Sequence, residues 1–237
     1  MREILSPAEL STAADGDAKV LWAAQGLTDG HRAWSAGDAV AVVAPDLSRH
    51  DRIVVHGPVD DAAPLVRDVL GIVGTAYRPF GDEELIRGLV DRIPELNLRA
   101  TFGWMEIDEA PVETVTARWF PDDAGVAELL EQASPTSYAW PGDRGINRWA
   151  GIEESGELLS VAADAWSAPE IGFVAGVATR PAARGRGLSR QVCAFVTAEL
   201  VKRHGRVALM VDGSNETAIG LYRKLGYRYH PVGAAHL

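Results

Sequence analysis

The sequence predicts an α/β protein in which helices flank a mixed, mostly antiparallel central sheet that is divided between two lobes. Of its 237 residues, 47% are hydrophobic and 24% are charged, an ordinary composition for a globular chain with a sizeable core. Short apolar runs alternate with amphipathic segments along the chain, which is typical of sheets covered by helices. A polar stretch at 108–111 indicates a boundary, so we expect lobes over 1–110 and 111–237.

The elements expected in the first lobe follow from periodicity and from the residues that end it. Helical spacing over about the first 30 residues stops near Gly26 and Gly30. Apolar residues three and four apart predict two later helices, and Pro94 ends the second of them. After the first helical segment, the expected order is strands 40–43 and 53–55 joined by a polar hairpin at 45–51, helices 62–73 and 82–93, and a strand over 98–107.

The second lobe repeats this alternation with stronger signals. An apolar stripe from Leu188 to Leu200 predicts a helix, and Ser214 and Gly226 are a candidate N-cap and C′ residue for the next one. The resulting order of elements indicates a mixed sheet. In order, we expect a strand over 112–119, a helix over 122–133, strands over 146–153, 157–166 and 170–179, a helix over 188–203, a strand over 207–211, a helix over 215–225 and a strand from 227 towards 231.

Charge and composition narrow the function classes. The net charge is −10, from 33 acidic and 23 basic residues, which disfavours nucleic-acid partners. No apolar run approaches the roughly 20 residues that span a bilayer, and the first residues form no long apolar segment, so we expect a cytoplasmic protein without a membrane partner. Cys193 has no second cysteine to pair with, and the six histidines form no tight pair, so no metal is expected.

The stretch from Val177 to Ser189 carries the chemical signal. A predicted strand ends, a turn follows, and Gly185 and Gly187 open a predicted helix. The first backbone N–H groups of a helix lack partners and face a positive dipole end, so such a turn suits an anion. Seven basic residues between positions 180 and 206 accompany only Glu199. The expected ligand is therefore a phosphate or a pyrophosphate.

Other phosphate motifs fit this stretch less well. A dinucleotide-binding turn needs a third glycine three residues after the second, and Arg190 occupies that position. A dinucleotide-dependent enzyme stays an open alternative, because the strand–turn–helix context is present. The glycine–lysine pair of a P-loop is absent from the sequence.

Two motifs in this lobe resemble those of the GNAT acyltransferase superfamily. The acyl-CoA loop of that family has the pattern Gln/Arg-x-x-Gly-x-Gly/Ala, which Arg184 and Gly187 match and from which Ser189 departs. The stretch from Asn215 to Tyr227 resembles the second motif, N-x-x-A-x-x-L-Y-x-x-L-G-F/Y. The resemblance covers about residues 112–237. It implies a GNAT catalytic domain there, with the acyl-CoA N-acyltransferase type of sheet, and suggests that 1–110 is a degenerate GNAT-like lobe.

The resemblance also implies roles for single residues. Tyr222 would be the general acid that protonates the departing thiolate. Gly176 would mark a bulge in the strand that binds the pantetheine arm. The residues expected to bind acetyl-CoA are Val177, Ala178, Thr179, Arg184, Gly185, Arg186, Gly187, Leu188, Ser189 and Asn215.

We therefore expect an N-acetyltransferase that uses acetyl-CoA as co-substrate and moves the acetyl group to an amine of a small molecule or peptide by direct attack. The alternative is a sensor module that binds acyl-CoA without catalysis. No carboxylate stands out as general base. Glu153, Glu154, Asp164 and Glu170 are candidates, each expected to be a solvated surface group.

Overall fold

The computed structural model describes residues 1–113 and 115–237, which form two compact units. The first unit comprises Met1–Trp104, Val211–Ser214 and His230–Leu237, and the second comprises Met105–Met210 and Asn215–Tyr229. A functional division into lobes over 1–110 and 111–237 stays a prediction. The expected fold class, a mixed and mostly antiparallel sheet flanked by helices, is confirmed.

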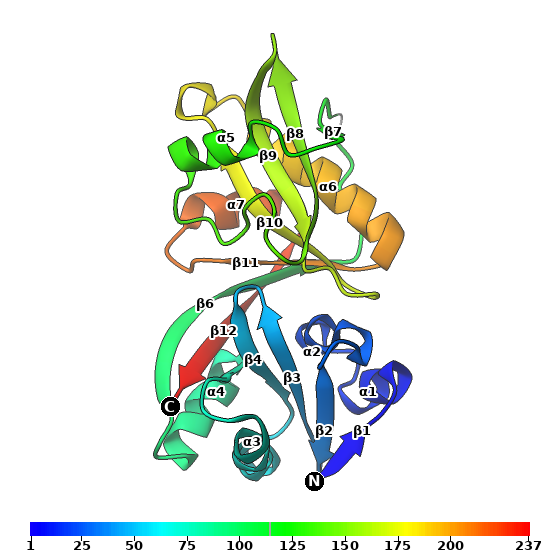
Figure 1. The fold of residues 1–237 in the computed structure, drawn as a ribbon, viewed down its shortest axis with the longest axis vertical. Coiled ribbons are helices and arrows are strands. Elements are labelled where there is room, and N and C mark those ends of the chain that lie inside the picture. Colours follow the sequence, from blue (N-terminus) through cyan, green and yellow to red (C-terminus); the bar gives the residue numbers. More distant parts are fainter. Residues whose placement is uncertain (114) are drawn as a thin grey trace. The chain divides into compact units, whose positions relative to one another are not determined.

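In the first unit the sheet has the strand order β1, β2, β3, β4, β5, β12, β6 (Figure 1). The strands β4 and β5 are parallel, whereas β12 pairs antiparallel with β5. The strands β1, β2 and β5 are short and were not anticipated from periodicity. The elements are β1 (Arg2–Ile4), α1 (Pro7–Ala13), α2 (Ala18–Ala24), β2 (Arg32–Ala36), β3 (Ala39–Leu47), β4 (His50–His56), α3 (Val59–Val73), β5 (Arg78–Asp82), α4 (Glu83–Arg92), β6 (Asn97–Ile107) and β12 (Arg228–His236).

An ion cluster around the largely buried pair of Asp17 and Lys19 lies at one end of the parallel strands of this unit. Asp17 caps α2, and the Nζ atom of Lys19 lies 2.8 Å from its Oδ2 atom and 3.1 Å from Oδ1 of Asp82, the last residue of β5. The Nδ1 atom of His56, the last residue of β4, lies 3.5 Å from the same Asp17 oxygen. Burial opposes ionisation of Asp17, but its bonds to His56 and Lys19 hold the pKa of this carboxyl well below its usual range.

In the second unit the strands follow the order β11, β10, β9, β8, β7. Helix α6 packs on β8, β9 and β10, and α5 packs on β9 and β10 (Figure 1). The β8–β9 hairpin turns at Ser155 and Gly156, as expected from the glycine. The elements are β7 (Arg118–Trp119), α5 (Val126–Ala133), β8 (Ile146–Glu154), β9 (Glu157–Ala165), β10 (Gly172–Thr179), α6 (Leu188–His204), β11 (Val207–Val211) and α7 (Glu216–Lys224).

Three expectations for this unit were wrong. Over 112–119 only Arg118 and Trp119 are in a strand among the residues described. Helix α5 begins four residues after Asp122, because the Asp122 carboxylate accepts from the Ala124 N–H in a turn and Gly125 has a φ of 76°. Asn215, rather than Ser214, caps α7: its side chain accepts from the Ala218 N–H at 3.0 Å.

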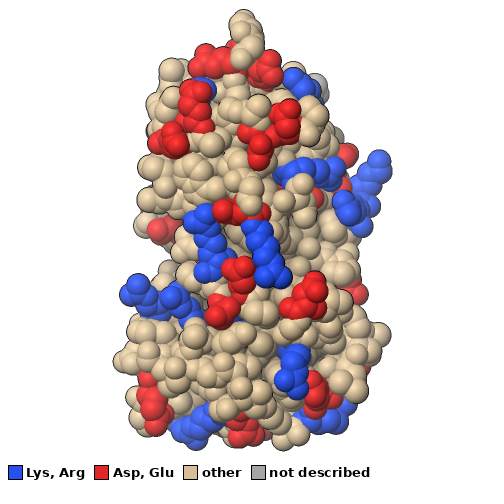
Figure 2. All heavy atoms as spheres, viewed as in Figure 1, with Lys and Arg blue, Asp and Glu red and all other residues tan. Residues whose placement is uncertain are grey.

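Basic and acidic side chains are interspersed on the face drawn in Figure 2. Within the described residues, no helix has both the length and the apolar character needed to cross a membrane.

Replacement of Lys19 by methionine should destabilise the first unit by about 3 kcal/mol, because it leaves the Asp17 carboxylate buried without its ammonium partner. Arg87→Met removes an exposed i,i+4 ion pair to Glu83 and should cost less than about 1 kcal/mol. Urea unfolding of both variants measures the difference. Equal losses would contradict a stabilising role for the buried cluster.

Candidate functional site

The two parallel strands of the second unit separate soon after they meet. In the described residues, β10 and β11 pair only at Gly172 with Val207 and at Phe173 with Ala208. Beyond Phe173 the edge of β10 that faced β11 no longer has a ladder partner there. A row of unpaired backbone groups on a strand edge is a ready template for an extended ligand.

A β-bulge lies at the position where the strands have separated. Ala175 and Ala178 of β10 pair with Ala163 and Val161 of β9, so the register of the two strands shifts between these pairs. Gly176, at this bulge, has a φ of 63°, which disfavours any residue with a side chain. A Cβ atom there would lie 2.5 Å from Cη2 of Trp149, so the indole rests directly on the glycine backbone. The bulge expected at Gly176 is present.

The segment after β10 leads into the N-terminus of α6 through two glycines in left-handed conformations. Gly185 has a φ of 79° and Gly187 a φ of 76°, and no side chain caps the helix. In the described part of the chain, no backbone carbonyl accepts from the N–H groups of 185–190. These donors, together with the helix dipole, make a site for an anion.

The arginines around this loop do not form the free basic cluster that the sequence suggested. Arg186 donates to Glu154 at 2.6 Å, and Nε of Arg190 donates to Glu113 at 2.6 Å. Arg180 is mostly buried and donates to the Leu158 carbonyl at 2.7 Å. Each of these three arginines is therefore partly neutralised or used to hold the fold, whereas the backbone N–H groups of 185–190 have no backbone acceptor in the described part of the chain.

Arg184 has a structural contact as well. Its guanidinium donates to the Thr179 carbonyl at 3.4 Å and to the Ala133 carbonyl, at the end of α5, at 3.2 Å. Both partners are neutral, so the full positive charge of Arg184 remains beside the loop.

Hydroxyl groups connect β9, β10 and α6 at the base of the loop. The Oγ1 atom of Thr179 lies 2.7 Å from Oγ of Ser160 and 2.6 Å from Oγ of Ser189. Ser160 is fully buried and Thr179 nearly so. Sequence reasoning missed Ser160, because a lone serine in an apolar strand has no pattern that marks it.

The two α7 residues expected at the site differ in environment. The side-chain oxygen of Asn215 caps α7, which leaves its side-chain NH2 group as a donor.

Tyr222 is buried, and its ring centroid lies 5.7 Å from that of Tyr227. Burial, with Cys193 and Tyr227 nearby, raises the pKa of Tyr222 well above the usual range. Tyr227 hydrogen-bonds Thr197 at 2.7 Å, whereas no described residue hydrogen-bonds the Tyr222 hydroxyl. Tyr222 is therefore a neutral phenol at physiological pH.

One carboxylate that was expected to be solvated is buried. Asp164 is 1% exposed and accepts from Asn147 at 3.1 Å and from Ser167 at 2.5 Å, while Arg148 lies 3.4 Å away. Ser167 in turn accepts from the Phe173 N–H of β10. These bonds give Asp164 a structural role at the start of β10. In the described segments, no group of three or more His, Cys, Asp or Glu side chains could hold a metal ion.

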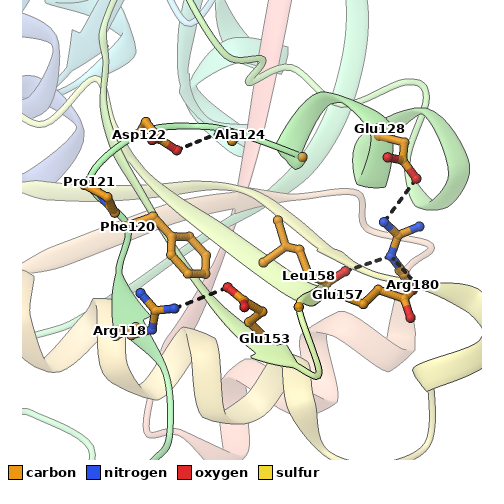
Figure 3. Close-up of a pocket in the computed structure, with 12 residues that line it drawn as sticks. Arg118, Phe120, Pro121, Asp122, Ala124, Glu128, Glu153, Glu157, Leu158 and Arg180 are labelled. Carbon is orange, nitrogen blue, oxygen red and sulfur yellow. Dashed lines mark hydrogen bonds and ion pairs between the residues drawn. The ribbon is translucent and has the colours of Figure 1, made fainter.

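A pocket of about 640 Å³ lies beside the β8–β9 turn and the start of α5, as Figure 3 shows. Phe120 and Leu158 provide its apolar part, and Arg118 pairs with Glu153 at its rim. None of the residues expected to bind acetyl-CoA lines it. A second cavity of about 310 Å³ includes Arg186 from the loop. The expected residues 177–179 lie instead on β10, beside its unpaired edge, and the chain continues from them directly into the loop.

Comparisons with known proteins agree on one family. A family model described as FR47-like protein matches residues 150–232. A mycothiol acetyltransferase of Rhodococcus jostii (strain RHA1) is 30% identical over 207 residues, 82% of this chain and 67% of the relative. Its counterpart in Salinispora arenicola (strain CNS-205) is 31% identical over 207 residues, 83% of this chain and 59% of the relative. The chain thus spans about two thirds or less of these relatives.

Solved structures share the fold. A GCN5-related N-acetyltransferase from Kribbella flavida superposes with a TM-score of 0.60 at 20% identity, over 92% of this chain and 93% of that one. Another from Sphaerobacter thermophilus gives a TM-score of 0.54 at 20% identity, over 100% and 94%.

Gly176→Ala should destabilise the second unit by about 2–3 kcal/mol, because it combines left-handed strain with a clash against Trp149. Gly156→Ala is the matched control: its φ is 82° but nothing lies within 4 Å, so only the strain of about 1 kcal/mol remains. Adding Trp149→Phe should recover part of the Gly176→Ala loss in urea unfolding. Identical losses for both alanine variants would show that the indole does not constrain the bulge.

Proposed function

Because this chain belongs to the GNAT superfamily of N-acetyltransferases, we propose that it moves an acetyl group from acetyl-CoA to an amine of a small molecule or peptide. The opening between β10 and β11, which leads into an uncapped helix with free N–H groups, is the observation that carries the proposal. An extended thioester and its phosphates need these two features in this order.

Acetyl-CoA would bind through the backbone. The pantetheine arm would pair with the free edge of β10 at Val177, Ala178 and Thr179, with the Asn215 amide as a further donor. The pyrophosphate would lie on the N–H groups of the expected stretch from Arg184 to Ser189 that are free, those from Gly185 to Ser189, near the charge of Arg184. The Arg184 N–H itself donates to the Pro181 carbonyl at 3.3 Å. Most of the rate enhancement would come from holding the two reactants in attack geometry.

Transfer would proceed by direct attack. The amine nitrogen forms a bond to the thioester carbonyl carbon, a backbone N–H near the bulge stabilises the oxyanion, and the carbon–sulfur bond breaks. The departing thiolate takes the Tyr222 phenol proton, and the proton that the attacking nitrogen loses as the amide forms passes through solvent to restore the phenol. Support for that role comes from the Tyr222 hydroxyl, which no described residue hydrogen-bonds and which is therefore free to donate. Burial raises the pKa of Tyr222, which keeps the phenol protonated but makes it a weaker acid.

The relatives suggest the acceptor to test first. Their name is mycothiol acetyltransferase, so the des-acetyl form of mycothiol is the first amine to try. Polyamines, antibiotics and peptide N-termini are further acceptors of the same class.

Tyr222→Phe should lower kcat about a hundredfold while the Kd for acetyl-CoA changes less than about twofold, because only proton donation is lost. Thiol release from acetyl-CoA with a panel of amines measures the rate, and calorimetry measures binding. Tyr227→Phe is the control, since it removes a neighbouring buried hydroxyl that bonds Thr197.

Three outcomes separate the candidate functions. Turnover by the wild type that survives Tyr222→Phe would remove Tyr222 from the chemistry. Tight acetyl-CoA binding with no amine acetylated would favour the sensor module. Saturable binding of NAD(H) with none of CoA would favour the dinucleotide alternative.

The first unit has its own parallel strand pair, but its features disfavour acyl-CoA. Gly81 of β5 approaches so closely that a Cβ atom would lie 2.6 Å from the Val55 carbonyl of β4, so these strands stay together. The connection to α3 is Gly57 and Pro58, and proline has no N–H to donate. Asp60 and Asp61 in the first turn of α3 would repel a phosphate.

Calorimetric titration should therefore give one acetyl-CoA per chain, lost on Gly187→Asp, which places a carboxylate in the phosphate loop. Lys19→Met should leave the stoichiometry at one. Two equivalents for the wild type, one of them surviving Gly187→Asp, would show that the first unit also binds the co-substrate.

A further inference from the structure

The hydroxyl chain at the base of the loop has a single hydrogen-bond direction. The Ser160 hydroxyl donates to the Ala178 carbonyl at 3.1 Å, and a carbonyl can only accept. Ser160 has one hydrogen, so in its 2.7 Å contact with Thr179 it accepts. Thr179 thus uses its own hydrogen on Ser160 and accepts from Ser189 at 2.6 Å. The direction is therefore Ser189 to Thr179 to Ser160 to Ala178.

This direction decides what the Ser189 side chain offers a ligand. Its hydrogen is used within the protein, so the oxygen presents only lone pairs. A phosphate oxygen also presents lone pairs and gains no hydrogen bond from it. The side chain of Ser189 therefore acts on the protein, although its backbone N–H stays free for an anion.

These hydrogen-bonded hydroxyls connect three elements at the point where the loop begins. Ser160 lies in β9 with no exposed surface, Thr179 is the last residue of β10, and Ser189 is in the first turn of α6. No side chain caps α6, and a Cβ atom added at Gly185 or Gly187 would have nothing within 4 Å, so these two glycines are not held by packing at their Cα atoms.

We propose that Ser160, Thr179 and Ser189 are positioning residues that fix the first turn of α6 against β10, so that its N–H groups converge on the pyrophosphate of acetyl-CoA. The inference rests on the proposed function. It also explains the departure from the family pattern: a serine at 189, in place of glycine or alanine, finds its acceptor in Thr179. The loop is then already ordered in the unbound protein, so its ordering does not weaken the binding of acetyl-CoA.

The test compares acetyl-CoA with S-acetylpantetheine, a thioester that lacks the pyrophosphate and nucleotide. Ser189→Ala and Thr179→Val should lower kcat/KM for acetyl-CoA about fivefold, the effect of one neutral hydrogen bond, through KM with kcat unchanged. Both variants should lower kcat/KM for S-acetylpantetheine less than they lower it for acetyl-CoA, because S-acetylpantetheine has no pyrophosphate to meet the first turn of α6. Thr179→Ser keeps the hydroxyl and should restore the wild-type ratio of the two constants.

Thr197→Val is the matched control. It removes a buried hydroxyl–hydroxyl bond of 2.7 Å from the same helix, away from the loop, so it should lower stability without changing the ratio between the two thioesters. Equal losses with both thioesters, or an unchanged KM for acetyl-CoA, would overturn the positioning role. A wild-type protein that neither binds CoA nor turns over either thioester would instead overturn the proposed function, and this inference with it.

Discussion

The site depends on one feature of the sheet: in the described residues, β10 and β11 are not paired beyond Phe173. The bulge at Gly176 turns β10, and the Trp149 indole fills the space that a side chain at 176 would need. Because the ring is nearly fully buried, it is held by the core of the second unit. The packing of this unit thus supports the bulge beside the unpaired edge of β10. The binding proposed for the co-substrate depends on that edge.

Most arginines near the loop are paired with carboxylates and do not form a free positive patch. Arg180, Arg186 and Arg190 each have a carboxylate partner, so their contribution to anion binding is screened. Affinity for phosphate would then come from short-range donors in fixed positions. Such an arrangement favours a ligand whose phosphates fit the turn over any anion that merely carries charge.

Sequence patterns predicted most of the fold because its long elements carry strong periodicity. The helix from Leu188 and the hairpin through Gly156 are examples, and the family resemblance placed the bulge at Gly176, the glycine within an apolar strand. The short strands β1, β2 and β5 were missed, since three to five residues show no reliable alternation.

The site was less accessible from sequence, because its decisive features are long-range contacts. No pattern in the sequence indicates that Asp164 is buried or that Asn147, 17 positions away, donates a hydrogen bond to it. Likewise, the carboxylate partners of Arg186 and Arg190 lie 32 and 77 positions away along the chain. Motif spacing located the loop and α7, but pairing and burial come only from the folded chain.

The path of β12 has a consequence for how the chain is made. Val232, Gly233 and Ala234 pair with β5 and lie within the first unit, although the residues of the second unit are translated between them and β5. A ribosome therefore exposes residues 1–104 long before the strand that completes their sheet exists. The β5 edge must wait unpaired while the second unit is synthesised, so the sheet of the first unit is completed only after the second unit has been made.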